Sequence, residues 1–235
     1  MNINGKNYEI PSVEGAKIRV RLHFTDPILG SWPSNPDLAT DYIASKAPDA
    51  MKIEQEIENL GVESVCEKGM TIFPRREEDN APIFYDYQVR GFFKESCALL
   101  SKASGKDANG KKKEANHSSK IKAYKKTVDG SVFVYPREIA IETDGMIEDC
   151  QRPLRASTPM GERVALAHSE MIPAENTWCE FTVEVLSDDL IPAVLEWLAY
   201  GKMHGMSQWR NSGKGRFMFE VLDDDGNVIG GNYHE

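Results

Sequence analysis

Three segments that lie far apart in this sequence alternate apolar and polar residues, and this alternation constrains the fold more than any other feature. In Lys17–Phe24, every second residue is apolar and the residues between are Lys, Arg, Arg and His. Trp178–Leu186 and Arg216–Leu222 show the same period of two. A period of two is typical of a strand that is buried on one face. We therefore predict three half-buried strands, the first of them with a basic open face.

Two further segments repeat their apolar residues at helical spacing. Gly91 leads into Phe92–Leu100, where apolar residues recur every three or four positions. Ser187, followed by two aspartates, is typical of a helix start, and the helix is expected to continue to about Tyr200. The resulting order is β-α-β-β-α-β, the plan of ferredoxin-like and RNA-recognition folds. The predicted fold class is therefore α+β, a modified ferredoxin-like/RNA-recognition fold with long insertions.

The length of 235 residues fits a single domain, 1–235, that contains two insertions. The first, about 25–88, is a loop and helical region in which Asp49–Leu60 fits a short helix. Short strands are predicted within it at Met70–Phe73 and Ile83–Val89. The second insertion, about 102–135, is a basic loop and hairpin. After it we expect a strand over 137–142 and two strands joined by a turn at Thr158–Gly161.

The second insertion holds much of the positive charge. The chain carries a net charge of −9, but Lys102–Lys126 has nine lysines against Asp107 and Glu114, a net +7, which leaves −16 elsewhere. Asp129-Gly130 between two β-rich runs predicts a hairpin turn. We therefore expect a protruding basic β-hairpin with Tyr124 among its lysines, which suits a sugar–phosphate backbone. A solvated charge run that prevents strand-edge aggregation is the alternative.

A second candidate for phosphate binding is Ala199–Phe219, which joins the last predicted helix to the last predicted strand. Gly205, Gly213 and Gly215 permit backbone conformations that other residues avoid. The segment also carries three cations and an aromatic ring: Arg210, Lys214, Arg216 and Trp209. Bare backbone N–H groups, cations and a ring together favour a phosphate-bearing ligand. A glycine turn that only redirects the chain is the alternative.

Motifs of the common enzyme and cofactor classes are missing from this sequence. It contains no GxxxxGK[ST], GxSxG or HExxH pattern, and no Cys or His pair has zinc spacing. We expect no cofactor and no metal. No apolar run is long enough to cross a membrane and no secretory signal is evident, so we expect a cytoplasmic protein with reduced core cysteines.

Three stretches, in the order 87–100, 152–186 and 197–223, resemble the RAMP superfamily of CRISPR systems, and within it the backbone subunits. The family's helix entry matches Arg90, Gly91, Phe92, Phe93 and Lys94, and its terminal Gly-x-Gly-Arg-Phe loop matches Gly213, Lys214, Gly215, Arg216 and Phe217. The resemblance implies a modified RNA-recognition fold with a protruding hairpin "thumb". It also implies sequence-independent binding of single-stranded RNA by adjacent copies along a filament.

Two features depart from this resemblance. Relatives are often basic, whereas this chain is acidic. Some relatives cut target RNA with an aspartate after the first strand, and here Asp26 is the weak catalytic candidate beside Asp37 and Asp41. The compact length and the unusual insertions fit a stand-alone or phage-borne relative, for which DNA binding is also open.

We therefore expect sequence-independent binding of single-stranded nucleic acid, RNA in preference to DNA, by copies that assemble side by side as a filament or effector-complex backbone. The expected partners are the nucleic acid, copies of the chain and other effector-complex subunits, with no membrane. A metal-dependent nuclease and an acidic protein-docking or inhibitor module are the alternatives. The residues predicted to contact nucleic acid are basic or belong to the glycine-rich segment: Arg19, Arg21, Arg90, Lys94, Lys111, Lys112, Lys113, Lys120, Lys122, Lys125, Lys126, Arg152, Arg155, Arg163, Trp209, Arg210, Gly213, Lys214, Gly215 and Arg216.

Overall fold

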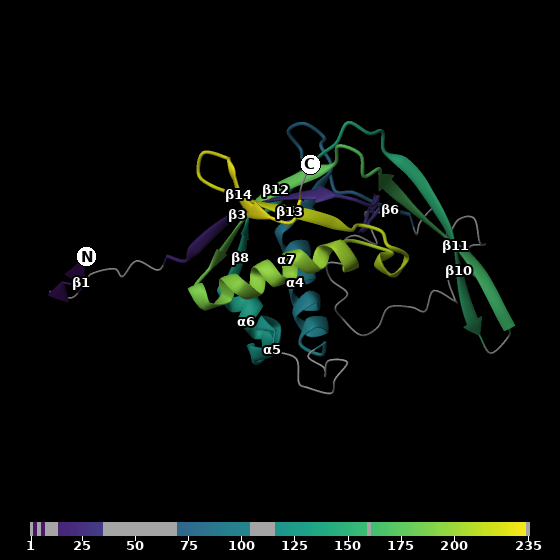
Figure 1. The fold of residues 1–235 in the computed structure, drawn as a ribbon. Helices are drawn as coiled ribbons and strands as arrows, with labels where there is room; N and C mark the ends of the chain where they lie inside the picture. The colour runs from purple at the N-terminus through teal and green to yellow at the C-terminus, as the bar shows by residue number, and fades with distance from the viewer. Residues whose placement is uncertain are drawn as a thin grey trace.

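The expected β-α-β-β-α-β order forms the centre of the fold (Figure 1). The computed structural model describes residues 2–3, 6–7, 14–34, 70–103, 116–158 and 161–233. Its central elements are β3 (Ala16–Phe24), α4 (Asp86–Leu100), β8 (Val132–Tyr135), β12 (Trp178–Val185), α7 (Ile191–His204) and β13 (Phe217–Leu222). The strands pair in the order β13-β3-β12-β8, and every pair is antiparallel. The predicted ferredoxin-like α+β class is therefore confirmed.

Additional strands widen this sheet and form a second one. β9 (Glu138–Glu142) and β7 (Ile83–Tyr85) extend the main sheet beyond β12, and β14 (Val228–Gly231) pairs with β13 at the other side. The second sheet contains β10 (Glu148–Thr158), β11 (Gly161–Ile172), β6 (Thr71–Ile72), β5 (Trp32–Pro33) and β4 (Ile28–Leu29). The remaining elements of the described chain are short: β1 (Asn2–Ile3), β2 (Lys6–Asn7), α5 (His117–Lys120), α6 (Tyr124–Ser131), η1 (Asp188–Leu190) and η2 (Arg210–Ser212).

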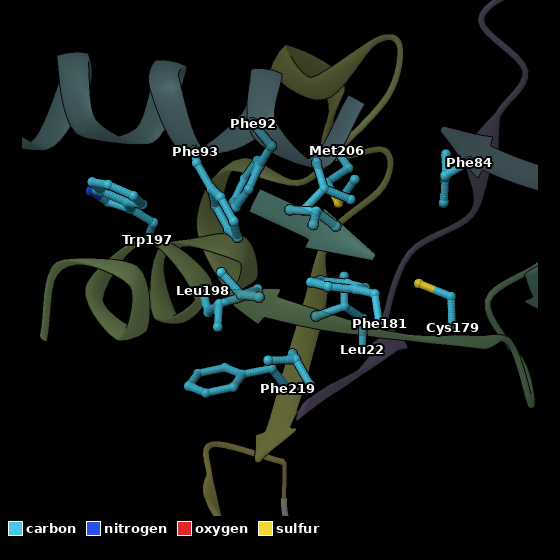
Figure 2. Close-up of a cluster of buried hydrophobic side chains, with 14 of the residues drawn as sticks. Leu22, Phe84, Phe92, Phe93, Cys179, Phe181, Trp197, Leu198, Met206 and Phe219 are labelled. Atoms are coloured by element: carbon cyan, nitrogen blue, oxygen red, sulfur yellow. The ribbon is translucent and has the colours of Figure 1, made fainter. Parts of the chain in front are cut away.

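The core lies between the main sheet and the helices, which cover one face of it (Figure 1). Alternate residues of β3 and β12 point into this layer, as their period of two predicts. Figure 2 shows Phe93 of α4 and Trp197 of α7 in this cluster, with ring centroids 5.5 Å apart. Met206, which follows α7, is also buried there. The segment that joins α7 to β13 is therefore anchored in the core.

The second insertion does not form the predicted basic β-hairpin. Asp129 and Gly130 lie in the last turn of α6, a helix that leads into β8. Tyr124 and Val128 are four residues apart, and both pack against the core, with Val128 fully buried. Packing of this i, i+4 pair against the body overrides the local turn signal of Asp-Gly. Lys125 and Lys126 therefore lie on a helix and not on a hairpin.

The first long helix of the described residues begins earlier than the sequence predicts. α4 begins at Asp86, before Gly91, because the strand predicted over Ile83–Val89 ends at Tyr85 and the chain then turns into the helix. The Gln88 side chain accepts a hydrogen bond from the Tyr85 N–H at 2.8 Å, which satisfies a donor at the helix start. The helix predicted over Asp49–Leu60 lies outside the described residues.

The longest hairpin of the described chain is formed by β10 and β11, on either side of the predicted turn at Thr158–Gly161. The two strands are 11 and 12 residues long, so each spans roughly 35 Å. Figure 1 shows this ribbon extending away from the body on the right. The protruding hairpin of this protein is therefore the β10–β11 ribbon.

Two cysteines lie in the core as expected, whereas Cys150 of β10 is only partly buried and Cys66 lies outside the described residues. Cys97 and Cys179 are buried and unpaired with another cysteine. Burial raises the pKa of both thiols, because an apolar environment disfavours the charged thiolate. Separately, none of the described helices combines the length and the apolar character needed to cross a membrane.

A buried hydrogen-bond network anchors α5 to α7, which predicts a stability effect. The Trp197 Nε1–H donates to Ser118 Oγ at 2.9 Å, and the Ser118 hydroxyl donates to Glu196. Ser118→Ala should lower the free energy of unfolding by about 1–3 kcal/mol, because the buried indole N–H loses its acceptor. Urea denaturation followed by circular dichroism measures this change. Ser187→Ala, an exposed serine without a side-chain cap bond, is the matched control and should change stability by less than about 0.5 kcal/mol.

Candidate nucleic-acid interface

The glycine loop, residues 205–216, closes on itself between α7 and β13. The Met206 N–H donates to the Gly215 carbonyl at 2.8 Å, and the Gly215 N–H donates to the Pro27 carbonyl at 2.9 Å. Gly205 and Gly215 have φ values of +75° and +71°, and a Cβ on Gly215 would lie 2.0 Å from the Met206 carbonyl oxygen. These positions require glycine because both the backbone conformation and the close approach exclude a side chain. The glycines therefore hold a closed loop.

The same hydrogen bonds correct part of the sequence prediction. The N–H groups of Gly205, Gly213 and Gly215 donate to Gly201, Arg210 and Pro27 carbonyls. These three groups are already paired, so they are not the bare donors that were expected to bind phosphate. The contribution of Gly213 and Gly215 is to shape the loop that presents its side chains.

Two side chains of the loop stand on strained backbone. Ser207 has φ +67° and Trp209 has φ +56°, in the left-handed region that residues with a Cβ rarely adopt. The Ser207 hydroxyl bonds the Leu29 carbonyl, which ties this part of the loop to β4. Strain of this kind persists where the surroundings fix it, and it is common at binding sites. Trp209 is therefore held in one place by the loop.

Trp209 and Arg152 meet across the base of the β10–β11 ribbon. The Arg152 guanidinium carbon lies 5.0 Å from the centroid of the Trp209 ring. Arg152 Nη2 donates to Gln208 Oε1 at 3.1 Å. The Arg152 Nε atom is buried and has no hydrogen-bond partner. A buried donor without an acceptor is rare in proteins, so this atom points to a missing acceptor.

A cavity of about 520 Å³, here called the loop pocket, opens at this contact. It lies where the loop meets α4, α7 and β10. The residues that line it are Glu95, Arg152, His204, Ser207, Gln208, Trp209, Arg210 and Asn211. It thus combines cations, amide groups and an aromatic ring, the residue types that bind a nucleotide.

One carboxylate of the loop pocket, that of Glu95, pairs with Arg210 and leaves Arg152 without an ion pair among the described residues. Glu95 of α4 forms an ion pair with Arg210 and lies 3.2 Å from His204 Nε2 through its other oxygen. Arg210 is therefore neutralised within the protein. Arg152 has no such ion pair within the described chain. The sequence contains no local signal for the Glu95–Arg210 contact, because the two residues come together only in the folded chain.

Arg216 and Lys214 lie beside the pocket at the end of the loop. The Arg216 guanidinium covers Gly213, since a Cβ there would lie 3.3 Å from its central carbon, and its Nε is buried without a hydrogen-bond partner. Lys214 Nζ lies 3.8 Å from the Met171 sulfur. Neither cation has an ion-pair partner among the residues that the structure describes. Arg152, Lys214 and Arg216 are therefore cations of the loop and of β10 that have no ion pair among the described residues.

The basic open face predicted for β3 is not basic in the fold. Arg19 and Arg21 both pair with Glu180 of β12, and Arg21 lies 3.7 Å from Glu220 of β13. Glu180 and Glu220 lie directly opposite Arg21 across the strands, and Glu180 is the diagonal neighbour of Arg19, so antiparallel pairing brings the opposite charges together. Arg19 and Arg21 are therefore placed in a network of ion pairs on the open face.

The cations of the predicted helix entry are paired as well. Arg90 Nη2 lies 2.9 Å from Asp86 Oδ2 one turn earlier in α4. Lys94 pairs with Asp129 of α6. The consecutive residues Lys94 and Glu95 thus connect α4 to α6 and to the glycine loop. α4 therefore contacts both basic regions predicted from the sequence, the second insertion through Lys94 and the glycine loop through Glu95.

The remaining predicted cations are divided between two regions. Lys120, Lys122, Lys125 and Lys126 are exposed on α5, α6 and the turn between them. Arg155 and Arg163 belong to the β10–β11 ribbon, opposite Val164 and Ala156 in register. Lys111, Lys112 and Lys113 lie outside the described residues.

The weak catalytic candidate Asp26 lies near the glycine loop. Its backbone N–H approaches the Arg216 carbonyl oxygen at 3.4 Å, and its carboxylate accepts a hydrogen bond from Thr25. In the described ranges, no three His, Cys, Asp or Glu side chains are grouped to hold a metal ion. Asp37 and Asp41 are outside those ranges.

Comparison with known proteins finds similarity in structure only. No protein-family model matches the sequence, and no curated protein matches it. A chain in the cryo-EM structure of the Type III-B Cmr-beta bound to cognate target RNA is similar at a TM-score of 0.47 and 7% identity; the match covers 89% of this chain and 60% of that one. The crystal structure of Cmr6 from Pyrococcus furiosus is similar at a TM-score of 0.46 and 9% identity, over 86% of this chain and 97% of that one. Both structures are named for Cmr proteins.

The closed glycine loop predicts opposite effects of two glycine substitutions. Gly215→Ala should lower the free energy of unfolding by more than about 1 kcal/mol, because its positive φ and the Met206 carbonyl both oppose a Cβ. Gly91→Ala, at an open helical position with no atom within 4 Å of the new Cβ, should raise it by about 0.5–1 kcal/mol. Thermal and urea unfolding measure both. Equal effects of the two substitutions would contradict the assigned role of Gly215.

Proposed function

We propose that this chain binds single-stranded nucleic acid at the loop pocket, independently of sequence. The observation that carries the proposal is Arg152. Its guanidinium lies over the Trp209 ring, and its Nε is buried without a hydrogen-bond partner. An oxyanion supplies the acceptor that this donor lacks, and the phosphates of nucleic acids present such oxygens regularly along the chain.

Phosphate is favoured over other acceptors by the charges at the pocket. Arg152, Lys214 and Arg216 have no ion-pair partner in the described chain, and two of them keep a buried Nε unpaired. Leaving a buried polar group unsatisfied costs about 1–3 kcal/mol, and a charged group costs more. Binding a phosphodiester removes that cost. It also releases counterions from the nucleic acid, which makes the affinity dependent on salt.

The ring in the pocket favours a single strand over a duplex. Trp209 is partly exposed on a strained, fixed backbone, and stacked bases of a duplex do not offer a free face to such a ring. Unstacked bases of any type can stack on it, so the contact tolerates every sequence. The resemblance to RNA-binding backbone subunits favours RNA as the ligand.

The β10–β11 ribbon gives the strand a second contact in this proposal. Arg152 lies at its base, and Arg155 and Arg163 lie farther along it. The resemblance implies a protruding hairpin "thumb", and the ribbon is the hairpin that extends from the body (Figure 1), which supports its assignment to that role. Side-by-side assembly of copies, with other effector-complex subunits, follows as part of the proposal. The exposed lysines of α5 and α6 are a separate basic surface that can contact the same or a neighbouring segment of strand.

A metal-dependent nuclease of the same fold is the second candidate function. Asp26 favours it, because its backbone contacts Arg216 at the edge of the loop. Incubation of labelled RNA with Mg²⁺ or Mn²⁺, with wild type and Asp26→Ala side by side, separates the two functions. Cleavage that depends on Asp26 supports the nuclease, and binding without cleavage supports the first proposal.

The first binding prediction concerns Arg152. Arg152→Ala should weaken binding of a labelled single-stranded RNA about tenfold, to a similar extent for unrelated sequences, because one phosphate contact is lost. The slope of log affinity against log salt should fall by about one. Fluorescence anisotropy at several salt concentrations measures both quantities.

The control variant removes one arginine from the open face of the main sheet, away from the loop pocket residues. Arg19→Ala deletes an arginine that is ion-paired with Glu180 on the open face. This substitution should leave both the affinity and the salt slope nearly unchanged. If Arg19→Ala and Arg152→Ala weaken binding equally, the interface is not at the loop pocket.

The second binding prediction concerns Glu95, which neutralises Arg210 within the pocket. Glu95→Gln should increase the affinity for single-stranded RNA about threefold, because Arg210 becomes available to phosphate and a repelling charge is removed. The same anisotropy titration measures the change. Glu180→Gln is the matched control, since it removes one carboxylate from the open face. A loss of affinity in Glu95→Gln would show instead that Glu95 holds Arg210 in its binding position.

A further inference from the structure

A second pocket lies on the open face of the main sheet, where β3 ends. Antiparallel pairing places His23 of β3 opposite Trp178 of β12, and Trp178 opposite Glu142 of β9. Residues that are directly opposite in neighbouring strands share one face, so these three side chains form a row across the sheet. They line a cavity of about 550 Å³ with Asp144 and Tyr233, here called the sheet-end pocket.

Aromatic rings form part of its wall. The Tyr233 ring stacks on His23, with ring centroids 3.8 Å apart and planes 5° from parallel. The Trp178 ring already accepts a guanidinium, because the central carbon of Arg21 lies 5.2 Å from its centroid. The rings on this face are therefore fixed, and one of them has a cation–π contact within the protein.

The charges around this pocket are acidic once the ion pairs are taken into account. Arg21 is paired with Glu180 and Glu220, and His23 Nε2 lies 2.9 Å from Glu220. Glu142 and Asp144 are exposed, and neither is in an ion pair within the described residues. Asp144 accepts one hydrogen bond, from Asn176 at 3.1 Å. Arg76, which is itself paired with Asp79, is a cation that acts electrostatically on Glu142. Two carboxylates without an ion pair at an aromatic wall repel phosphate and attract a cation.

We propose that the sheet-end pocket binds a guanidinium group, carried by an arginine side chain of a partner protein. The planar cation stacks on an aromatic wall formed by Trp178 and Tyr233, and its N–H groups donate to Glu142 and Asp144. The inference is independent of the nucleic-acid site, which uses unpaired cations on the glycine loop. With both proposals, the protein has two binding surfaces that select ligands of opposite charge: the loop pocket binds a polyanion and the sheet-end pocket binds a basic protein.

The test compares arginine with a neutral molecule of the same shape. N-acetyl-arginine methylamide and N-acetyl-citrulline methylamide are titrated into the full chain labelled with ¹⁵N. The indole N–H signal of Trp178, identified by its loss in Trp178→Phe, reports on the pocket. The arginine probe should shift this signal saturably, and the citrulline probe should not, because it carries no charge.

A charge-matched pair of variants tests the carboxylates. Glu142→Gln with Asp144→Asn should weaken the arginine response about fivefold or more, as expected for the loss of two exposed ion pairs. Asp224→Asn with Asp225→Asn removes two exposed carboxylates from the turn after β13 and should leave the response unchanged. An equal response to both probes, or a response that survives in the first variant, would overturn the proposal. A Trp178 shift caused by a single-stranded oligonucleotide and not by arginine would overturn it in favour of nucleic acid.

Discussion

The closure of the glycine loop onto the end of β3 is the constraint on which the candidate interface depends. Met206 is buried in the core, and its N–H is bonded to Gly215, which is itself bonded to Pro27. This closure sets where the chain between α7 and β13 can run, and so where Trp209 and Arg216 stand. The side chains proposed to bind nucleic acid are thus positioned by the connection that completes the ferredoxin-like plan.

Ion pairing, more than the number of cations, decides which basic residues are available to a ligand. Arg19, Arg21 and Arg90 each face a carboxylate on a neighbouring strand or helix turn. Arg152 and Arg216 have no such ion pair among the described residues, and each keeps a buried Nε without a partner, as Arg90 also does. Exposed ion pairs contribute little to stability, but each one removes a charge from the set that can meet a phosphate. The distribution of acidic residues therefore shapes the interface as much as the arginines do.

The sequence predicts the central strands and helices because their signals are periodic and their burial is one-sided, as in β3, β12 and α7. It fails at Asp129-Gly130, where a local turn signal loses to the packing of Tyr124 and Val128 on the core. The turn at Thr158–Gly161 is predicted, but the sequence alone does not show that its strands form the protruding ribbon. The Glu95–Arg210 contact joins residues 115 positions apart, so it has no local signal at all.

A net charge of −9 is compatible with binding a polyanion because dissolved ions screen electrostatic interactions beyond a short distance. At physiological ionic strength the Debye length is about 8 Å, so exposed charges farther away than this are largely screened. The potential at the loop pocket then depends most on the charged residues that line it, Arg152 and the Glu95–Arg210 pair. On the open face of the main sheet the same screening leaves Glu142 and Asp144 as the charges that an approaching group meets first. One acidic chain can therefore present sites of opposite sign, provided that its sheet and helices keep them apart.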